Sequence, residues 1–486
     1  DNMADYTIVG AGVSGLSLAV LLAEEGHRVT LLEQGATASP TLHGFCRQGV
    51  YFDTGVHYLG AVGKDGLLRR LLDRLGIGEP LRFWPMGPCF DTYRAVGERE
   101  LCVDYRAGRD AFAEGLSEAF PRETRAIRRF CTMACEAFPE LAEKLLVEPN
   151  SLANMVGLVG PPTLSDYLRE LTDNVDLRRV LSAHTVLHGT PPDQVPLNFH
   201  AMVAGSFMES AHYVEGGGRA IVNAFCARLE QLGVTLRCRS RVTGLDLSAA
   251  GAMRGLRLAD GSRIETTRCI ATVHPRLLLD WVPESALGHS FARRQRRMQD
   301  SACAHVVYGI APAGLPALRG RNLILDPQPE AGLAWQWPCF LAAGQVPDAD
   351  PVAFSLILAS DGKETLAQPG SAIDYRSEGY RVAKDEAMRR AEAFLREHCQ
   401  DELGTFSLVE GATALTFRYY TNSPNGGLYG IRHTTKAWGH APTTGIDGLF
   451  LSGQAVMAPG VLGAAMAAFV TCGRMPGCGV SPRIQR

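Results

Sequence analysis

The segment from Tyr6 to Gly35, YTIVGAGVSGLSLAVLLAEEGHRVTLLEQG, constrains the fold of this chain more than any other. Its first four residues are β-branched or aromatic and predict a short buried strand. Glycines then follow at the spacing G-x-G-x-x-G, and apolar residues recur at helical spacing up to Gly26. A second strand-like run, RVTLLE, ends on Glu33. Together these elements predict a βαβ unit.

The glycine spacing predicts a site for a dinucleotide. Gly10 permits a tight bend, Gly12 leaves the backbone open to a pyrophosphate, and Gly15 lets the helix approach the strand. The N-terminus of that helix then offers free amides to phosphate. Glu33 stands about 20 residues on, where an acid binds the ribose hydroxyls, and this favours FAD or NAD. The alternative is a glycine turn in an ordinary α/β domain, with Glu33 on the surface.

Charge and cysteine content narrow the classes of function. The chain has 486 residues, enough for two domains, and a net charge of −3, which gives no basic field for nucleic acid. Its 13 cysteines include no C-x-x-C pair, and no signal-peptide pattern opens the chain, so we expect a reduced cytoplasmic protein. The pairs Cys131/Cys135 and His184/His188 are each one helical turn apart, but without further ligands nearby they favour core packing and predict no metal site.

The longest apolar tract, roughly residues 455–470, makes a poor membrane span because it contains Pro459, Gly460 and Gly463. A soluble protein, or one in peripheral contact with a membrane, is therefore expected. The oligomeric state is left open by the sequence.

Strand-rich and helix-rich segments interleave along the chain. Residues 1–80, 210–280 and 406–486 predict one discontinuous α/β domain, with a hairpin turning at Asp260 and Gly261. Residues 81–209 and 281–405 predict an inserted, mixed α+β and helix-rich domain for the substrate. Two of its stretches, VGLVGPPTL from Val156 and HTVLHGTPPDQVPLNFHAMVAGSFMES from His184, are apolar enough to suit either core packing or a lipophilic tunnel.

Several motifs together resemble the FAD-dependent family of phytoene desaturases, carotenoid cis-trans isomerases and all-trans-retinol 13,14-reductase, which is related more distantly to amine oxidases. They are CRQGVYFDTGVHYLG from Cys46, YVEGGGRAIVNAF from Tyr213, LYGIRHT from Leu428 and LFLSGQAVMAPGVLGAAM from Leu449. The resemblance covers nearly the whole chain in order. It implies a Rossmann-type domain that binds FAD non-covalently.

Carried over to this sequence, the resemblance implies which residues hold the FAD. The ADP half would be bound by the glycine turn and Glu33, and the adenine by the backbone of Val242. The ribitol and the isoalloxazine ring of the FAD would lie along the segment that begins at Leu449. The implied cofactor-binding residues are Gly10, Gly12, Val13, Ser14, Gly15, Glu33, Gln34, Gly44, Val242, Gly453, Gln454, Gly460, Val461 and Leu462.

The sequence departs from the family pattern at two places. After Glu33 the family usually carries an Arg and a Gly-Gly pair against the pyrophosphate, whereas here only Gly44 remains in QGATASPTLHGF. Many relatives carry an acid in or after the Gly-Gln position, where this chain has Gln454 and Ala455. Gln454 can still hydrogen-bond ribitol or phosphate oxygens.

For acid-base chemistry the resemblance points to His57 and Tyr58, in the segment expected beside the flavin. His57, neutral or charged, would deliver a proton or stabilise charge on a polyene, and the alternative is that it only binds backbone carbonyls. The second candidates are Arg418, Tyr419, Tyr420 and His433, in FRYYTNSPNGGLYGIRH, as a wall on the substrate side or the flavin side.

The function implied is an FAD-dependent oxidoreductase that desaturates, saturates or isomerises carbon-carbon double bonds of a lipophilic conjugated substrate, such as a polyene, carotenoid or retinoid-like molecule. Two alternatives stay open. One is a flavin amine oxidase, and the other is a non-catalytic prenyl or lipid carrier on the same fold.

Overall fold

The computed structural model describes residues 3–97, 100–147, 159–312, 318, 320–327, 337–343, 351–360 and 377–480. Of the apolar stretch that begins at Val156, residues 156–158 lie outside this part of the chain.

A five-stranded parallel sheet forms the centre of one half of the molecule, in the order β10-β2-β1-β14-β20. Its central strands, β1 and β14, are almost wholly buried, as expected for parallel strands covered on both faces. The strands are β1 (Asp5–Val9), β2 (Arg28–Leu32), β10 (Thr235–Arg237), β14 (Cys269–Ala271) and β20 (Leu449–Leu451).

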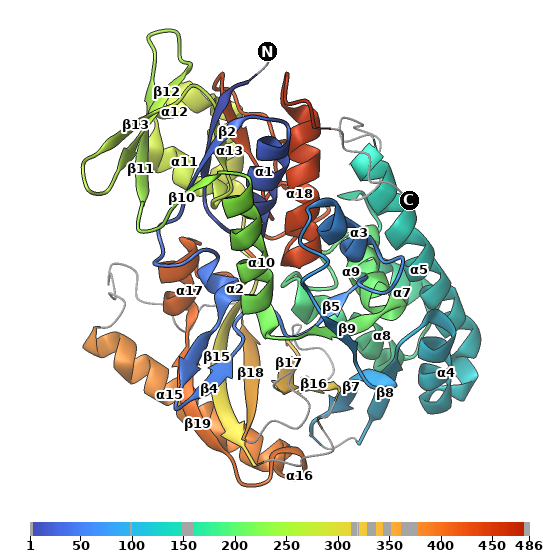
Figure 1. The fold of residues 1–486 in the computed structure, drawn as a ribbon. Coiled ribbons are helices and arrows are strands. Elements are labelled where there is room, and N and C mark those ends of the chain that lie inside the picture. The colour runs from blue at the N-terminus through green and yellow to red at the C-terminus, as the bar shows by residue number, and fades with distance from the viewer. Residues whose placement is uncertain are drawn as a thin grey trace.

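Helices cover this sheet, and the segment from residue 6 to residue 35 forms the predicted βαβ unit. α1 (Val13–Glu24) connects β1 to β2 and packs against α18 (Gly460–Arg474), although the two lie more than 400 residues apart. Figure 1 shows them side by side, with α10 (Gly217–Gln231) reaching from this half toward the other. The short helices here are α2 (Pro40–His43), α3 (Leu67–Arg74), α11 (Leu278–Trp281), α12 (Glu284–Leu287) and α13 (His289–Arg297).

A three-stranded antiparallel sheet projects from this half, at the upper left of Figure 1. It consists of β11 (Val242–Leu247), β12 (Met253–Leu258) and β13 (Arg263–Glu265). The turn between β12 and β13 holds Asp260 and Gly261, which has φ +84°. The hairpin predicted there is confirmed.

The second half is built on a seven-stranded sheet in the order β19-β15-β18-β17-β16-β7-β8. All of its pairs are antiparallel except β16 with β7. α15 (Glu378–His398) covers one face through β15 and β19, at the lower left of Figure 1. The strands are β19 (Ser407–Ala412), β15 (Cys303–Ala311), β18 (Val352–Ser360), β17 (Cys339–Ala343), β16 (Asn322–Asp326), β7 (Cys89–Ala95) and β8 (Cys102–Arg106).

Helices flank the β7–β8 end of this sheet, with α5 packed along α9 and α4. They are α4 (Arg109–Ala119), α5 (Thr124–Val147), α7 (Leu164–Leu171), α8 (Val175–Ser182) and α9 (Leu197–Glu209), while α16 (Gln400–Leu403) and α17 (Ala414–Thr421) follow α15. Two small sheets join the halves: β3 (Phe45–Arg47) with β4 (Val50–Phe52), and β5 (Leu59–Gly60), β9 (Ala211–Val214) and β6 (Phe83–Pro85). Three 3-10 turns complete the described elements: η1 (Pro121–Glu123), η2 (Ala183–Leu187) and η3 (Pro275–Leu277).

Segments of the two halves alternate along the chain, and the domain boundaries stay a prediction. The prediction starts the last α/β segment at residue 406, yet β19 (Ser407–Ala412) pairs with β15 in the seven-stranded sheet. Of the strands described in this segment, β20 joins the parallel sheet. A lone short strand such as β19 gives no sequence signal for which sheet it joins, because pairing depends on distant residues.

Within the described part of the chain, every helix is too short or too polar to cross a bilayer.

Candidate functional site

The glycine turn after β1 shows why each glycine stands at its position. Gly10 has φ +103°, a conformation that other residues rarely adopt. A Cβ on Gly15 would lie 1.9 Å from the carbonyl oxygen of Gly10, so only glycine lets α1 approach the turn this closely. Gly12, the N-cap of α1, has no heavy atom within 4 Å of an added Cβ. The side of the turn at Gly12 is therefore open.

Two helix N-termini face this open side. α1 begins after Gly12, and α18 begins at Gly460, where an added Cβ would also meet nothing within 4 Å. Neither helix carries an acidic residue in its first turn. Free amides and the positive ends of two helix dipoles are thus directed at the same space, which suits an anion such as a pyrophosphate.

Glu33, at the end of β2, is 6% exposed and holds the glycine turn directly. Its Oε2 accepts a hydrogen bond from the amide of Ala11 at 3.0 Å, and its Oε1 accepts one from the amide of Gly35 at 2.7 Å. The same carboxylate lines the cavity beside the turn. Glu33 therefore supports the turn as well as facing the space predicted for a ribose.

We expect Glu33→Gln to weaken FAD binding by about 1.5–3 kcal/mol, because a charged acceptor is replaced by a neutral one. Titration of apoprotein with FAD measures this loss. Glu79→Gln, at an exposed position, is the matched control and should bind FAD as the unmodified protein does. Equal affinity in the two variants would contradict a direct role of the Glu33 carboxylate.

A long cavity runs from the glycine turn toward the seven-stranded sheet. It gathers residues from β1, α1, β2, β11, α17 and the loop before α18, which are far apart in sequence. Most of the predicted site residues line it. They are Gly10, Gly12, Val13, Ser14, Glu33, Gln34, His57, Val242, Tyr420, Gly453, Gln454, Gly460 and Val461.

Other predicted residues lie elsewhere. Gly15 packs on Gly10, behind the turn. Gly44 has φ +68°, and a Cβ there would come within 2.5 Å of Tyr51 and Phe52, so it serves a tight turn rather than the cavity wall. Leu462 packs partly buried against the core.

Arg418 and Tyr58 also lie outside the cavity lining. Arg418 is exposed on α17. Tyr58 is 6% exposed and donates a hydrogen bond to Asp91 Oδ2 at 2.8 Å. Burial and the neighbouring Asp91 raise the pKa of Tyr58 well above its ordinary value, so its hydroxyl stays protonated. The geometry thus places Tyr58 in the core and does not support a role in proton transfer.

Several lining residues were missed by the sequence reasoning. Thr272 follows β14 and its Oγ1 donates to the carbonyl oxygens of Val9 and Gly10, both at 3.0 Å. Its position at the carboxyl end of a parallel strand is a signal that could have identified it. Val306 and Ile357 also line the cavity, but they lie on β15 and β18 of the seven-stranded sheet and carry no local signal.

At the far end of the cavity, Gln454 connects two backbone segments. Its side-chain amide donates to the carbonyl oxygen of Tyr429 and accepts from the amide of Gly430, both at 3.2 Å. The backbone carbonyl oxygen of Gln454 accepts a hydrogen bond from His433 Nε2 at 2.9 Å. Gln454 is therefore held on two sides, and His433 lies behind it rather than in the lining.

His57 borders the same end of the cavity, near Phe340, with ring centroids 6.0 Å apart. Its Nδ1 lies 3.5 Å from Ser355 Oγ. Burial lowers the pKa of His57 to about 4, because a charged imidazole is poorly solvated there. His57 is therefore neutral at physiological pH. Of the two charge states that the sequence left open, the structure favours the neutral one.

Further histidines near Gln454 are also kept neutral by burial. It lowers the pKa of His433 to about 4 and that of His200 to about 3. His200 Nδ1 lies 3.1 Å from His188 Nε2, and both rings are almost fully buried. The other residues of the two pairs considered as metal ligands are also in the core region: His184 pairs with Asp91, and Cys131 and Cys135 lie on α5. In the described residues no three such side chains come together to hold a metal.

These buried histidines predict that the protein loses stability in mild acid. The unfolded chain has ordinary histidine pKa values near 6.5, so between about pH 6.5 and pH 4 it binds more protons than the folded chain. Stability should fall as the pH falls through this window, on the order of 2 kcal/mol at pH 5 for His433 alone. Urea unfolding between pH 7.5 and pH 5 measures the slope. His433→Gln should flatten it and exposed His289→Gln should not; identical slopes would contradict the assignment.

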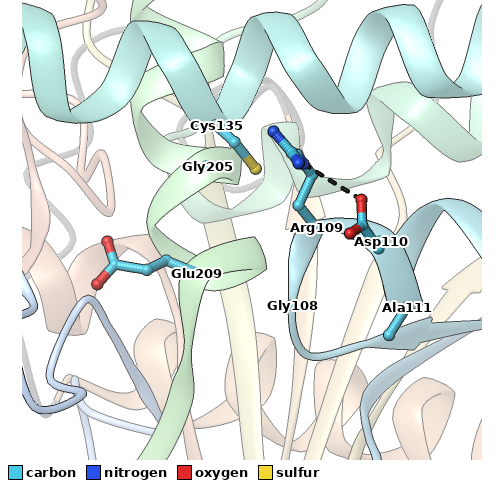
Figure 2. Close-up of a pocket in the computed structure, with 7 residues that line it drawn as sticks. All are labelled: Gly108, Arg109, Asp110, Ala111, Cys135, Gly205 and Glu209. Carbon is cyan, nitrogen blue, oxygen red and sulfur yellow. Dashed lines mark hydrogen bonds and ion pairs between the residues drawn. The ribbon is translucent and has the colours of Figure 1, made fainter.

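A separate hollow lies between α4, α5 and α9, as Figure 2 shows. Its lining includes Arg109, Cys135 and Glu209. The guanidinium of Arg109 forms an ion pair with Asp110 at 3.3 Å. None of the predicted site residues lines this hollow. The long cavity beside the glycine turn is therefore the candidate site.

Comparison with known proteins agrees with this geometry. Residues 5–274, more than half of the chain, match the model of the DAO family, described as FAD dependent oxidoreductase. The solved structure of an oxidoreductase from Methanosarcina mazei is similar in fold, with a TM-score of 0.67 at 12% identity, over 96% of this chain and 98% of that one.

Three curated relatives share sequence with the chain. All-trans-retinol 13,14-reductase from Danio rerio is 30% identical over 53% of this chain and 45% of its own length. The Rattus norvegicus protein of that name is 23% identical over 96% of this chain and 84% of its own length. Hydroxyneurosporene desaturase from Rubrivivax gelatinosus is 27% identical over 53% of this chain and 51% of its own length. The match thus spans about half the length of two of these relatives.

Proposed function

Because the chain belongs to the DAO family of FAD-dependent oxidoreductases, we propose that it acts on carbon-carbon double bonds of a lipophilic, conjugated substrate. The relatives named for retinol reduction and hydroxyneurosporene desaturation support this substrate class. Bound FAD supplies the exchange of electrons with a substrate carbon. The protein has to bind, orient and desolvate that substrate.

The cavity fits an FAD, and we propose the following contacts. Gly10, Gly12, Val13 and Ser14 would receive the pyrophosphate on the α1 N-terminus, and Glu33 with Gln34 would hold the ribose. Val242 would lie against the adenine. At the other end, Gly453, Gln454, Gly460 and Val461 would contact the ribitol and the ring. The open sides of Gly12 and Gly460 carry this assignment, since both leave room that a side chain would fill.

One observation carries the proposal for the substrate: the strands of the seven-stranded sheet give the cavity an apolar wall. Val306 and its strand partner Ile357 form this wall, and His57, which also lines the cavity, is neutral. Burying a conjugated hydrocarbon against it gains about 25 cal/mol per Å² of apolar surface. An amine oxidase would need groups that stabilise a cationic amine, and this wall offers few. A lipid carrier would not require the open glycine turn.

His57 is proposed to shape and orient the substrate as a neutral imidazole. An imidazole with a pKa of about 4 is not protonated at neutral pH, and so it is a poor general acid there. Protonation would begin only as the pH falls toward about 4. We therefore expect the pH profile of kcat between pH 6 and pH 8 to keep its shape in His57→Gln, even where its height falls. A limb near pH 6.5 that disappears in the variant would contradict this role.

The function is tested in two parallel experiments without oxygen. Photoreduced holoprotein is mixed with long conjugated polyenes in one, and oxidised holoprotein is mixed with the same polyenes in the other. Saturation shortens the conjugated system and shifts polyene absorption to shorter wavelength while the reduced flavin reoxidises. Desaturation lengthens the system and reduces the oxidised flavin, and isomerisation changes the absorption with no net change in flavin. A primary amine series with peroxide detection is the control. Reaction with amines alone would favour the amine oxidase, and flavin-free protein would favour the carrier.

We also propose that the protein contacts membrane surfaces, from which a lipophilic substrate would come. Tyr419 and Tyr420, on α17, are 53% and 40% exposed, and Tyr420 reaches the cavity. Tyrosine favours the boundary between lipid and water. Sedimentation with phosphatidylcholine vesicles should fall in the variant Tyr419→Ser, and equal sedimentation would oppose this contact.

A further inference from the structure

A second, smaller cavity adjoins the long cavity at His57, the residue that both linings share. Its walls include Val50, Phe52, Tyr308 and Ala342. It lies among β4, β15, β17 and β18, on the side of His57 away from the glycine turn. No role in holding FAD falls to this space.

The two cavities lie along one continuous face of the seven-stranded sheet. On β15, Val306 lines the long cavity and Tyr308 the second. On β18, Ile357 pairs with Val306 and lines the long cavity, while Ser355 pairs with Tyr308 and lines the second cavity. Residues two apart on a strand share a face and stand about 7 Å apart. One elongated molecule could therefore lie along this face and occupy both cavities.

Among the polar residues that line the second cavity, Asp53 carries a carboxylate. Asp53 Oδ1 accepts hydrogen bonds from the amide of Gly218 at 2.8 Å and from Tyr51 Oη at 2.9 Å. Both bonds converge on Oδ1, and Oδ2 lies toward Gly217, where an added Cβ would be 2.2 Å away. Among the described residues Oδ2 accepts no hydrogen bond, so it can take one from a donor in the cavity.

Among the described residues, no lysine or arginine lines the second cavity. Arg219 is the neighbouring charge, but its guanidinium lies over the ring of Tyr51, 4.0 Å from the centroid, and donates to Cys46 Sγ at 3.4 Å. Arg219 offsets part of the charge of Asp53 but does not line the cavity, so an anion there would meet the Asp53 carboxylate first, and like charges brought together in this way are costly.

We propose that the second cavity is the subsite for the non-reacting end of the substrate, and that Asp53 selects a neutral, hydroxyl-bearing end over a carboxylate or phosphate. This inference rests on the proposed function, since it assumes a long lipophilic substrate across His57. It adds a specificity that the apolar wall of the long cavity cannot supply.

The test compares a conjugated polyene alcohol with the carboxylic acid of the same carbon skeleton. Binding to oxidised holoprotein is followed by the change in the flavin absorption spectrum at pH 8, where Asp53, whose pKa burial raises to about 6, is ionised. The alcohol should bind at least about tenfold more tightly than the acid. Asp53→Asn keeps an acceptor for Gly218 and Tyr51 and should reduce this preference to less than about threefold. Asp173→Asn, an exposed site, controls for net charge and should keep the preference.

A second variant separates the subsite from the stability of Asp53. Ala342→Phe fills the second cavity and should weaken the full-length alcohol about tenfold, while a polyene truncated before its end group binds as before. Unchanged binding of the full-length alcohol, or equal preference for acid and alcohol in the unmodified protein, would overturn the proposal. If no polyene alters the flavin spectrum, the proposed function fails, and the subsite fails with it. If polyenes react but neither variant discriminates, only the subsite is wrong.

Discussion

Gly12→Val is expected to yield a folded protein that binds no FAD. Gly12 has φ −72°, which any residue adopts, and an added Cβ there has no heavy atom within 4 Å, so valine should not strain the turn. Its methyl groups would instead occupy the place of the pyrophosphate. We expect a loss of affinity of at least about 100-fold, roughly 3 kcal/mol. Flavin absorbance per polypeptide measures the loss, and circular dichroism and thermal unfolding report the fold.

Gly15→Ala, three residues further on, is the matched comparison. Its Cβ would lie 1.9 Å from the Gly10 carbonyl oxygen, so this smaller substitution should disrupt the turn itself and lower the thermal stability. FAD released by acid from the unmodified protein, and absent from the precipitate, would show that binding is non-covalent. Full flavin absorbance in the Gly12→Val protein would contradict the assignment of the pyrophosphate to this turn.

Asp91→Ala is expected to destabilise the folded protein by about 3–5 kcal/mol. Asp91 is fully buried and accepts hydrogen bonds from Tyr58 at 2.8 Å, His184 at 2.9 Å and Asn322 at 2.9 Å. Removing the carboxylate leaves these donors buried without their acceptor, and leaves a void. Urea unfolding of apoprotein measures the change, so that FAD affinity does not enter it.

Two comparisons make this prediction specific. Asp173→Ala, at an exposed position, should change stability by less than about 0.5 kcal/mol. Tyr58→Phe removes one donor and should cost about 1 kcal/mol, with flavin content unchanged. An Asp91→Ala protein as stable as the Asp173→Ala protein would show that the network contributes little. Lost turnover in Tyr58→Phe at full stability would return Tyr58 to the mechanism.

The cofactor half of the site could be predicted from sequence because its signals are local. The strand, glycine turn, helix and Glu33 lie within one short segment, and their spacing follows from backbone geometry. The family and its FAD, inferred from several such motifs, are confirmed by the match over residues 5–274. Gln454 was identified from its own motif, though its bonds to Tyr429 and Gly430 were not.

The substrate half could not be predicted in the same way, because its contacts join residues that are distant in sequence. His57 and Tyr58 are neighbours, yet one borders both cavities and the other bonds to Asp91 in the core. The chain bends at His57, just before β5, and the motif does not say which of the two side chains faces the site. Val306 and Ile357 reach the cavity only because β15 and β18 pair with each other.

The order of the parallel sheet has a consequence for synthesis on the ribosome. β1 and β2 emerge early, but β14 and β20, which complete the sheet, emerge after residues 268 and 448, and α18 comes later still. The nascent chain therefore carries an unfinished sheet edge through most of its translation, and long-range parallel pairing of this kind is slow and exposed to aggregation. Flavin cannot be fully enclosed until α18, which lines the cavity, has left the tunnel, so cofactor capture would follow synthesis of every strand of the parallel sheet.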